Sequence, residues 1–198
     1  MKHSDHNPML REGLVMGPAI ALLEVASIAR GMEVASGILW EADIELLFAT
    51  SVQPGKYVML FTGSIEDLRS ALQRGGEEAA GDLLDQLLIP QVHPQVETAL
   101  RRTQGQIQGT IDALGVLETA NVASAILAAD SALKRANVDL LELRIANGLG
   151  GKSYVSLTGE VSDVRAAIAA GSAEAERSGQ LLRQVVVPSP HPGLVPFL

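Results

Sequence analysis

Residues 21–47 read ALLEVASIARGMEVASGILWEADIELL, and residues 113–141 follow the same order as ALGVLETANVASAILAADSALKRANVDLL. Later landmarks recur too, because Lys56 matches Lys152 and His93 matches His191. The register holds within each copy and shifts only by two-residue loop insertions. We therefore interpret the chain as two copies of one domain.

The repeat predicts four segments along the chain. They are an N-terminal arm at 1–17, a first domain at 18–97, a linker at 98–111 and a second domain at 112–198. The arm is polar and mixed in composition, and the linker is rich in glutamine. Each domain is large enough to bury its own core.

Each copy predicts the element order β-α-β-β-α-β. In the first copy the strands are expected at 20–25, 44–48, 57–62 and 84–89, and the helices at 28–40 and 65–78. In the second copy the strands are expected at 114–118, 138–145, 153–158 and 182–187, and the helices at 122–135 and 161–177. This order predicts an α+β fold of two ferredoxin-like domains, each a four-stranded antiparallel sheet with both helices on one face.

Two local patterns add detail to the first domain. Ser27 and Ser64 are predicted to cap the two helices. Four small or apolar residues at helical spacing predict the buried stripe of the first helix, namely Ala29, Met32, Ala35 and Leu39.

Composition excludes several function classes. Apolar residues make up 47% of the chain but aromatic residues only 3%, and no apolar run is long enough to span a membrane. The net charge of −8 argues against nucleic-acid binding, and the absence of cysteine excludes disulfides and thiolate-bound clusters. We expect a soluble, cytoplasmic protein without a cofactor.

The repeated motifs resemble those of the bacterial microcompartment (BMC) shell proteins of the tandem-domain type. Besides the opening stretches, residues 54–72 read PGKYVMLFTGSIEDLRSAL and residues 150–168 read GGKSYVSLTGEVSDVRAAI. The closing VVVPSPHPGL at 185–194 resembles the last strand and Pro-His segment of the family. The order of elements is that of the unpermuted subgroup named for the propanediol-utilisation tandem protein T.

The resemblance implies a structural role in the shell of a microcompartment. Three chains would close into a pseudohexagonal trimer, and these tiles would pack with single-domain hexamers and pentameric vertex proteins into a facet. The loop between the second and third strands of each domain would line an axial pore for small polar metabolites. The predicted pore residues are Val52, Gln53 and Pro54 in the first domain and Ala146, Asn147, Gly148 and Leu149 in the second. Read without the resemblance, the same residues are ordinary turns.

The chain departs from the family pattern at three places. Some relatives carry a cysteine that holds an iron–sulfur cluster in the first pore loop, where this chain has Gln53. The tile-edge lysine is present as Lys134, but Trp40 takes its place in the first domain. The arginine of the closing segment is replaced by Gln91 in the first domain and by Ser189 in the second. The predicted tile edge thus consists of Trp40, Lys134, Gln91 and Ser189.

Two other interpretations remain open at this point. A tandem small-molecule-binding regulatory module could use the same fold. An enzyme is disfavoured, because Glu24 and Glu118 read as capping carboxylates and no Ser, Cys or Asp is placed to form a triad with His93 or His191. His3 and His6 are too loosely spaced for a metal site, and Gly151-Lys152-Ser153 lacks the first glycine and the following helix of a phosphate loop.

Overall fold

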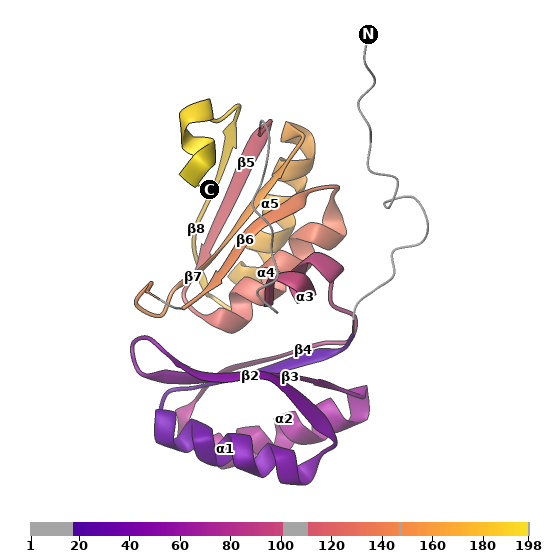
Figure 1. The fold of residues 1–198 in the computed structure, drawn as a ribbon, viewed down its shortest axis with the longest axis vertical. Coiled ribbons are helices and arrows are strands. Elements are labelled where there is room, and N and C mark those ends of the chain that lie inside the picture. Colours follow the sequence, from indigo (N-terminus) through magenta and orange to yellow (C-terminus); the bar gives the residue numbers. More distant parts are fainter. Residues whose placement is uncertain (1–17, 101–110, 147, 198) are drawn as a thin grey trace.

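The chain folds into two consecutive α+β domains with the same topology (Figure 1). The computed structural model describes residues 18–100, 111–146 and 148–197. The predicted N-terminal arm and most of the predicted linker lie outside the described residues. None of the helices in the described part is long and apolar enough to cross a membrane.

The first domain is built on one antiparallel sheet in the order β2-β3-β1-β4. Its elements are β1 (Ile20–Val25), α1 (Ile28–Glu41), β2 (Ile44–Val52), β3 (Lys56–Gly63), α2 (Ile65–Ala79), a 3₁₀ turn (Ala80–Asp82) and β4 (Leu83–Ile89). Strand β1 is central and pairs with both β3 and β4. Helices α1 and α2 cover one face of this sheet (Figure 1).

The second domain repeats this arrangement in the order β6-β7-β5-β8. Its elements are β5 (Ala113–Thr119), α4 (Val122–Arg135), β6 (Asp139–Ile145), β7 (Ser153–Gly159), α5 (Val161–Arg177), β8 (Leu181–Pro188) and a closing 3₁₀ helix (Pro192–Phe197). Central β5 pairs with β7 and β8. The predicted fold is therefore confirmed, with strand ends within a few residues of those expected.

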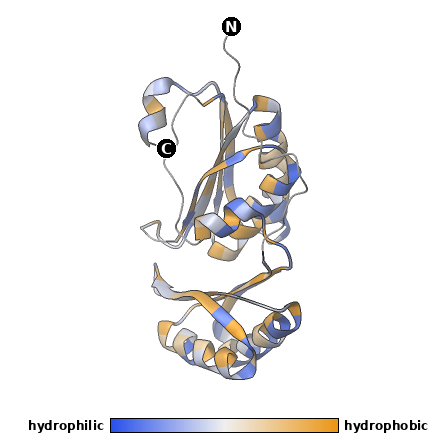
Figure 2. Ribbon diagram, turned by 45° about the vertical axis from the view of Figure 1, so that its right-hand side comes forward, coloured by the Kyte–Doolittle hydropathy of each residue, from blue (hydrophilic) through white to orange (hydrophobic). Residues whose placement is uncertain are grey.

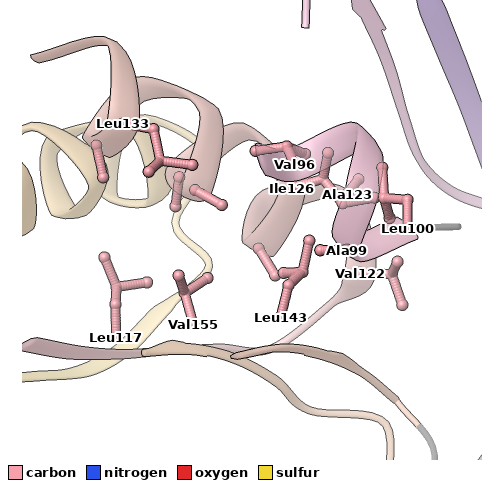
Figure 3. Packing of buried hydrophobic residues seen from close by; sticks show 14 of the residues in the cluster. Val96, Ala99, Leu100, Leu117, Val122, Ala123, Ile126, Leu133, Leu143 and Val155 are labelled. Carbon is pink, nitrogen blue, oxygen red and sulfur yellow. The ribbon is translucent and has the colours of Figure 1, made fainter. Parts of the chain in front are cut away.

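Helix α3 (Pro94–Leu100), which the sequence analysis did not predict, crosses the expected boundary between the first domain and the linker. Val96, Ala99 and Leu100 are buried against α4 and the strands of the second domain, and Figure 3 shows these side chains pointing toward Ala123 and Ile126. The sequence analysis missed this helix because its apolar stripe is only seven residues long, and stable packing comes from the second domain.

Helix α1 buries a different face from the one predicted. Its buried residues are Gly31, Val34, Ala35 and Ile38, whereas Ala29, Met32 and Leu39 are exposed. The helix carries apolar residues on two faces, and periodicity alone cannot tell which one meets the sheet. The predicted caps are confirmed, since Ser27 Oγ accepts from the Arg30 amide and Ser64 Oγ from the Asp67 amide.

The two domains share one hydrophobic cluster. It joins Leu22, Leu60 and Leu87 on the open face of the first sheet to Val122 and Ile126 of α4. Helix α4 contacts β1 and β4, so the open face of the first sheet looks toward the second domain. Helices α1 and α2 lie on the side of the first sheet away from the second domain (Figures 1 and 2), where no other element of the described residues covers them.

Small residues let the helices approach the sheets closely. A Cβ built on Gly31 would lie 2.4 Å from Tyr57 Cβ, far inside normal van der Waals contact. In the same helix the atoms nearest to a Cβ on Gly37 would be those of the Glu78 carboxylate, which lies at the end of a flexible side chain. The two glycines therefore have different tolerance for a side chain.

We expect Gly31→Ala to destabilise the protein, because α1 must move away from Tyr57 to admit the methyl group. Overpacking of this kind lowers the free energy of unfolding by about 1–3 kcal/mol. The matched control Gly37→Ala should be neutral or gain up to about 1 kcal/mol from helix propensity. Denaturant titration measures both, and equal stability of the two variants would contradict this account of the packing.

Candidate functional site

The tips of the two β-hairpins lie side by side, although they come from different domains. The first tip contains Gln53 and Pro54 between β2 and β3, and the second spans 146–152 between β6 and β7 (Figure 1). A Cβ built on Gly151 would lie 3.0 Å from Pro54 Cδ and 3.2 Å from the Gln53 carbonyl oxygen. The fold thus brings together the two loops that the sequence analysis predicted to line a pore.

Burial narrows the set of predicted pore residues. Gln53 and Pro54 are exposed, as is Gly148, while Leu149 is half-buried. Val52 ends strand β2 with a buried side chain, and Ala146 is fully buried with φ 52°. The side chains of Val52 and Ala146 are therefore covered within the single chain, unlike those of Gln53 and Pro54. Asn147 lies outside the described residues.

The stems of the two hairpins differ in chemistry. Arg144 and Tyr154 are paired across β6 and β7, and the guanidinium lies 5.8 Å from the ring centroid. The Tyr154 hydroxyl donates a hydrogen bond to Glu142. Burial, together with this carboxylate, raises the pKa of Tyr154 to about 12. The corresponding pair in the first domain is Thr50 and Val58, which carry no charge.

A buried carboxylate joins the two domains at one end of α4. Glu24 is fully buried, and its Oε1 accepts from Lys56 Nζ at 2.8 Å. Its Oε2 accepts from the Val122 amide at 3.0 Å, at the first turn of α4. Beside it the helix cap Asn121 donates to Asp85 at 2.7 Å. The positive end of the α4 dipole thus meets acidic side chains of the first domain. The prediction that Glu24 is a capping carboxylate is confirmed.

A second polar contact joins the domains near the other end of α4. Asp130 accepts from the His93 amide at 2.8 Å and from Lys134 Nζ at 2.5 Å. Lys134 also donates to the Gln91 carbonyl oxygen at 2.6 Å. Lys134 and Gln91, predicted at a tile edge, are therefore bonded to each other at the junction between the domains of one chain.

The other two predicted edge residues lie on the surface of the single chain. Trp40 is 90% exposed at the C-terminal end of α1, so it is not a core residue. Ser189 is exposed just after β8 and adopts φ 49°. They occupy the positions that Lys134 and Gln91 occupy in the other half of the repeat.

The structure gives no support to the candidate catalytic residues. His93 is buried, and its Nδ1 accepts from the Gln95 amide. Among the described residues no group of three or more His, Cys, Asp or Glu is placed to hold a metal ion.

An open groove of about 350 Å³ between α5 and β8 is lined by residues such as Arg165, Ser172 and Glu176.

Sequence reasoning missed the polar residues that make the junction. Asp85, Asn121 and Asp130 were not singled out, because each is an ordinary surface residue in an isolated repeat. The usable signal was a difference between the copies: Asp130 corresponds to Ser36, and Asp85 to Arg183. Only knowledge of which faces meet turns such differences into a contact.

The pKa of His93 lies below its usual range, chiefly because burial penalises the charged ring. Asp130 raises this pKa in part, and Lys134 lowers it further. Since the folded protein holds the neutral form, the unfolded chain binds the proton more readily. Stability is therefore full above about pH 6.5, the pKa of an unperturbed histidine, and falls as the pH drops below it.

We expect His93→Gln to flatten this loss of stability between about pH 6.5 and 5. The midpoint of denaturation, measured across this range for both proteins, tests it. The matched control is His191→Gln, which makes the same substitution at the exposed equivalent. A profile unchanged by His93→Gln would contradict the assignment.

Comparison with known proteins places the chain in a family. The BMC domain family matches it twice, over residues 19–92 and 113–190. It is 36% identical over 176 residues to the bacterial microcompartment shell protein PduT of Citrobacter freundii, covering 89% of this chain and 95% of that protein. A crystal structure of a microcompartment protein from Desulfitobacterium hafniense superposes with a TM-score of 0.79 at 46% identity, covering 90% of this chain and 98% of that one. A fused permuted hexameric shell protein of the RMM microcompartment shares the fold with a TM-score of 0.60, at 23% identity and over 81% and 82% of the two chains. The chain is a tandem-domain member of the BMC family and a structural protein of the bacterial microcompartment shell.

Proposed function

We propose that three copies of the chain close into a pseudohexagonal tile with a pore on its axis. The observation that carries this proposal is a mismatch between the two halves of the repeat. Surfaces that are buried where the two domains meet have exposed, apolar equivalents on the other half. The exposed surfaces on α1 and β8 are therefore expected to meet each other between chains.

Helices α1 and α4 show the mismatch most directly. Ile126 of α4 is fully buried, whereas the equivalent Met32 of α1 is 57% exposed. Likewise Val122 is buried and Ile28 is exposed. The second domain of another chain would cover this face of α1, as the first domain covers α4.

The last strands show the complementary half of the mismatch. Leu87 of β4 is 4% exposed within the junction, whereas its equivalent Val185 of β8 is 45% exposed. Glu118 is half-buried and is equivalent to Glu24. In the proposed contact Glu118 would accept from the amide of Ile28 at the first turn of α1 of another copy, as Glu24 does from Val122.

Such head-to-tail contacts close into a ring or run on as a filament. A ring of three chains contains six domains, with junctions alternating within and between chains. The hairpin tips of all six domains would then gather at one place, since the two tips of each chain are already adjacent. The tip residue Gln53 offers uncharged donors and acceptors, which suits small polar metabolites.

The other parts of the role follow from this placement. The tiles would pack beside single-domain hexamers and pentameric vertex proteins of the same shell. Nucleic acid and lipid are not expected as partners. We propose no catalytic activity and no cofactor, in keeping with a chain that contains no cysteine. The alternative of a regulatory ligand-binding module has no support among the relatives, which are shell proteins.

Light scattering of the purified protein should give a mass of about three times the 20.8 kDa of one chain. Val185→Asp should weaken the trimer by about 2 kcal/mol or more, because it buries a charge in the contact between chains. Leu182→Asp is the matched control on the same strand, since Leu182 and its equivalent Leu84 are each 46% exposed, the latter even where the domains meet. A wild-type monomer, or equal effects of the two variants, would overturn the proposed interface.

Gln53→Trp should slow the passage of small neutral solutes through assembled shells while the trimer mass stays unchanged. The flux is read from the rate at which such a solute reaches an enclosed enzyme. Gln73→Trp, at another exposed glutamine, which lies on α2, serves as control. If Gln53→Trp instead breaks the trimer, the first hairpin tip is a packing element and not the wall of a pore.

A further inference from the structure

Trp40 stands at the position where the other half of the repeat has its bridging lysine. Helices α1 and α4 each have 14 residues and end in an extended cap, so Trp40 and Lys134 occupy the same place on the two helices. Lys134 reaches from there to the Gln91 carbonyl oxygen, at 2.6 Å. In the single chain Trp40 is 90% exposed.

We propose that Trp40 packs onto Pro188 and Ser189 of the neighbouring copy in the same trimer, with its indole N–H donating to the Ser189 carbonyl oxygen. The inference rests on the proposed trimer and identifies a partner for the Trp40 side chain, which is 90% exposed in the single chain. It assigns Trp40 to the contact between chains of one tile, and not to the edge between tiles.

The two helices carry different hydrogen-bond donors at this position, Lys134 on α4 and Trp40 on α1. Lys134 needs a counter-charge, and Asp130 supplies it one helical turn away. The equivalent of Asp130 is Ser36, so the α1 face provides no such counter-ion at that position. An indole has one N–H donor and no charge, so it can satisfy a carbonyl oxygen there without a counter-ion. The replacement of Lys134 by Trp40 is therefore compatible with the replacement of Asp130 by Ser36.

The segment that would face Trp40, around Ser189, differs from the segment around Gln91 that faces Lys134. Gln91 lies between Pro90 and Val92, whereas Ser189 lies between two prolines. Pro188 and Ser189 are exposed, and the Ser189 amide donates to the Asp112 carbonyl oxygen at 2.8 Å, which fixes the segment to its own domain. Aromatic side chains commonly recognise proline-containing segments, because the rigid proline rings lose little entropy on binding. Pro190, which replaces Val92 of the other half, is buried, whereas Trp40 and the exposed Pro188 lie on the two surfaces expected to meet.

Other exposed residues of α1 extend the apolar surface around Trp40. Leu39 and Met32 are 46% and 57% exposed on α1. In the proposed contact, Val185 of the neighbouring copy's β8, which is 45% exposed in the single chain, would lie opposite them. A large aromatic side chain at the margin of such a patch is a common anchor of protein interfaces. Because one junction uses an ion pair and the other an aromatic ring, each helix end matches one closing segment only, which would keep the domains in alternating order.

Trp40 is the only tryptophan in the chain, so its fluorescence reports the contact directly. In the trimer we expect an emission maximum blue-shifted from that of N-acetyl-tryptophanamide, and clear protection from acrylamide quenching. The Val185→Asp protein, separated as single chains, should lose both. A trimer whose Trp40 is quenched as readily as the free amide would overturn the inference while leaving the trimer in place. A blue shift that appears only when trimers associate into sheets would overturn it too, in favour of the tile edge.

Substitutions on both sides provide the second test. Trp40→Ala should raise the dissociation constant of the trimer about tenfold or more. Ser189→Asp, which places a charge beside the ring, should have a similar effect, and the double variant should be less than additive. Ile65→Ala is the matched control, an exposed apolar residue at the start of α2. Additive effects, or no effect of Trp40→Ala on a protein of trimer mass, would refute the contact. A wild-type protein of single-chain mass would refute the trimer as well.

Discussion

The arrangement of the two domains depends on one buried carboxylate. Glu24 has no exposed surface and sits between the Lys56 ammonium and the first turn of α4. The ammonium supplies the counter-charge and the Val122 amide satisfies the second oxygen, so removing Lys56 would leave a charge without its counter-ion away from water. The hydrogen bond from the Val122 amide to Glu24 therefore fixes the position of α4 along the first sheet. From that register follow the shared hydrophobic cluster and the adjacency of the hairpin tips.

The polar contact of Asp130 and Lys134 fixes the orientation of α4, which the contact at Glu24 alone would not. Asp130 and Lys134 hold the chain at Gln91 and His93, where it leaves the first sheet. Helix α4 is thus held near both ends, and apolar packing fills the space between them. Apolar contacts alone tolerate sliding, whereas directional hydrogen bonds at two points do not. The polar groups supply the orientation, and the apolar area supplies most of the stabilisation.

The fold was predictable from the sequence because each repeat carries its own local signals. Apolar strand segments and glycine turns are local signals, and the duplication presents them twice. The serine caps belong to the first copy alone, since Asn121 caps α4 and Glu160 makes no side-chain cap hydrogen bond at α5. Three features were out of reach for physical reasons. Helix α3 is short and stable only by packing, α1 has two apolar faces, and Val52 and Ala146 differ from their loop neighbours only in burial. The candidate site was predicted as two loops. The polar junction beside them depends on contacts between residues far apart in the chain, such as Glu24 and Val122.

The packing of α3 on α4 has a consequence for how a tile would behave on dilution. The connection between the domains is partly a short rigid helix seated on the second domain, so half of the junctions in a closed ring are held by the covalent chain at a very high local concentration. Only the remaining half can dissociate. A duplicated gene product of this kind would lose subunits at far lower concentrations than six separate domains joined by the same contacts. It would also keep two unlike loops in strict alternation around the axis, which no ring of identical single domains can do.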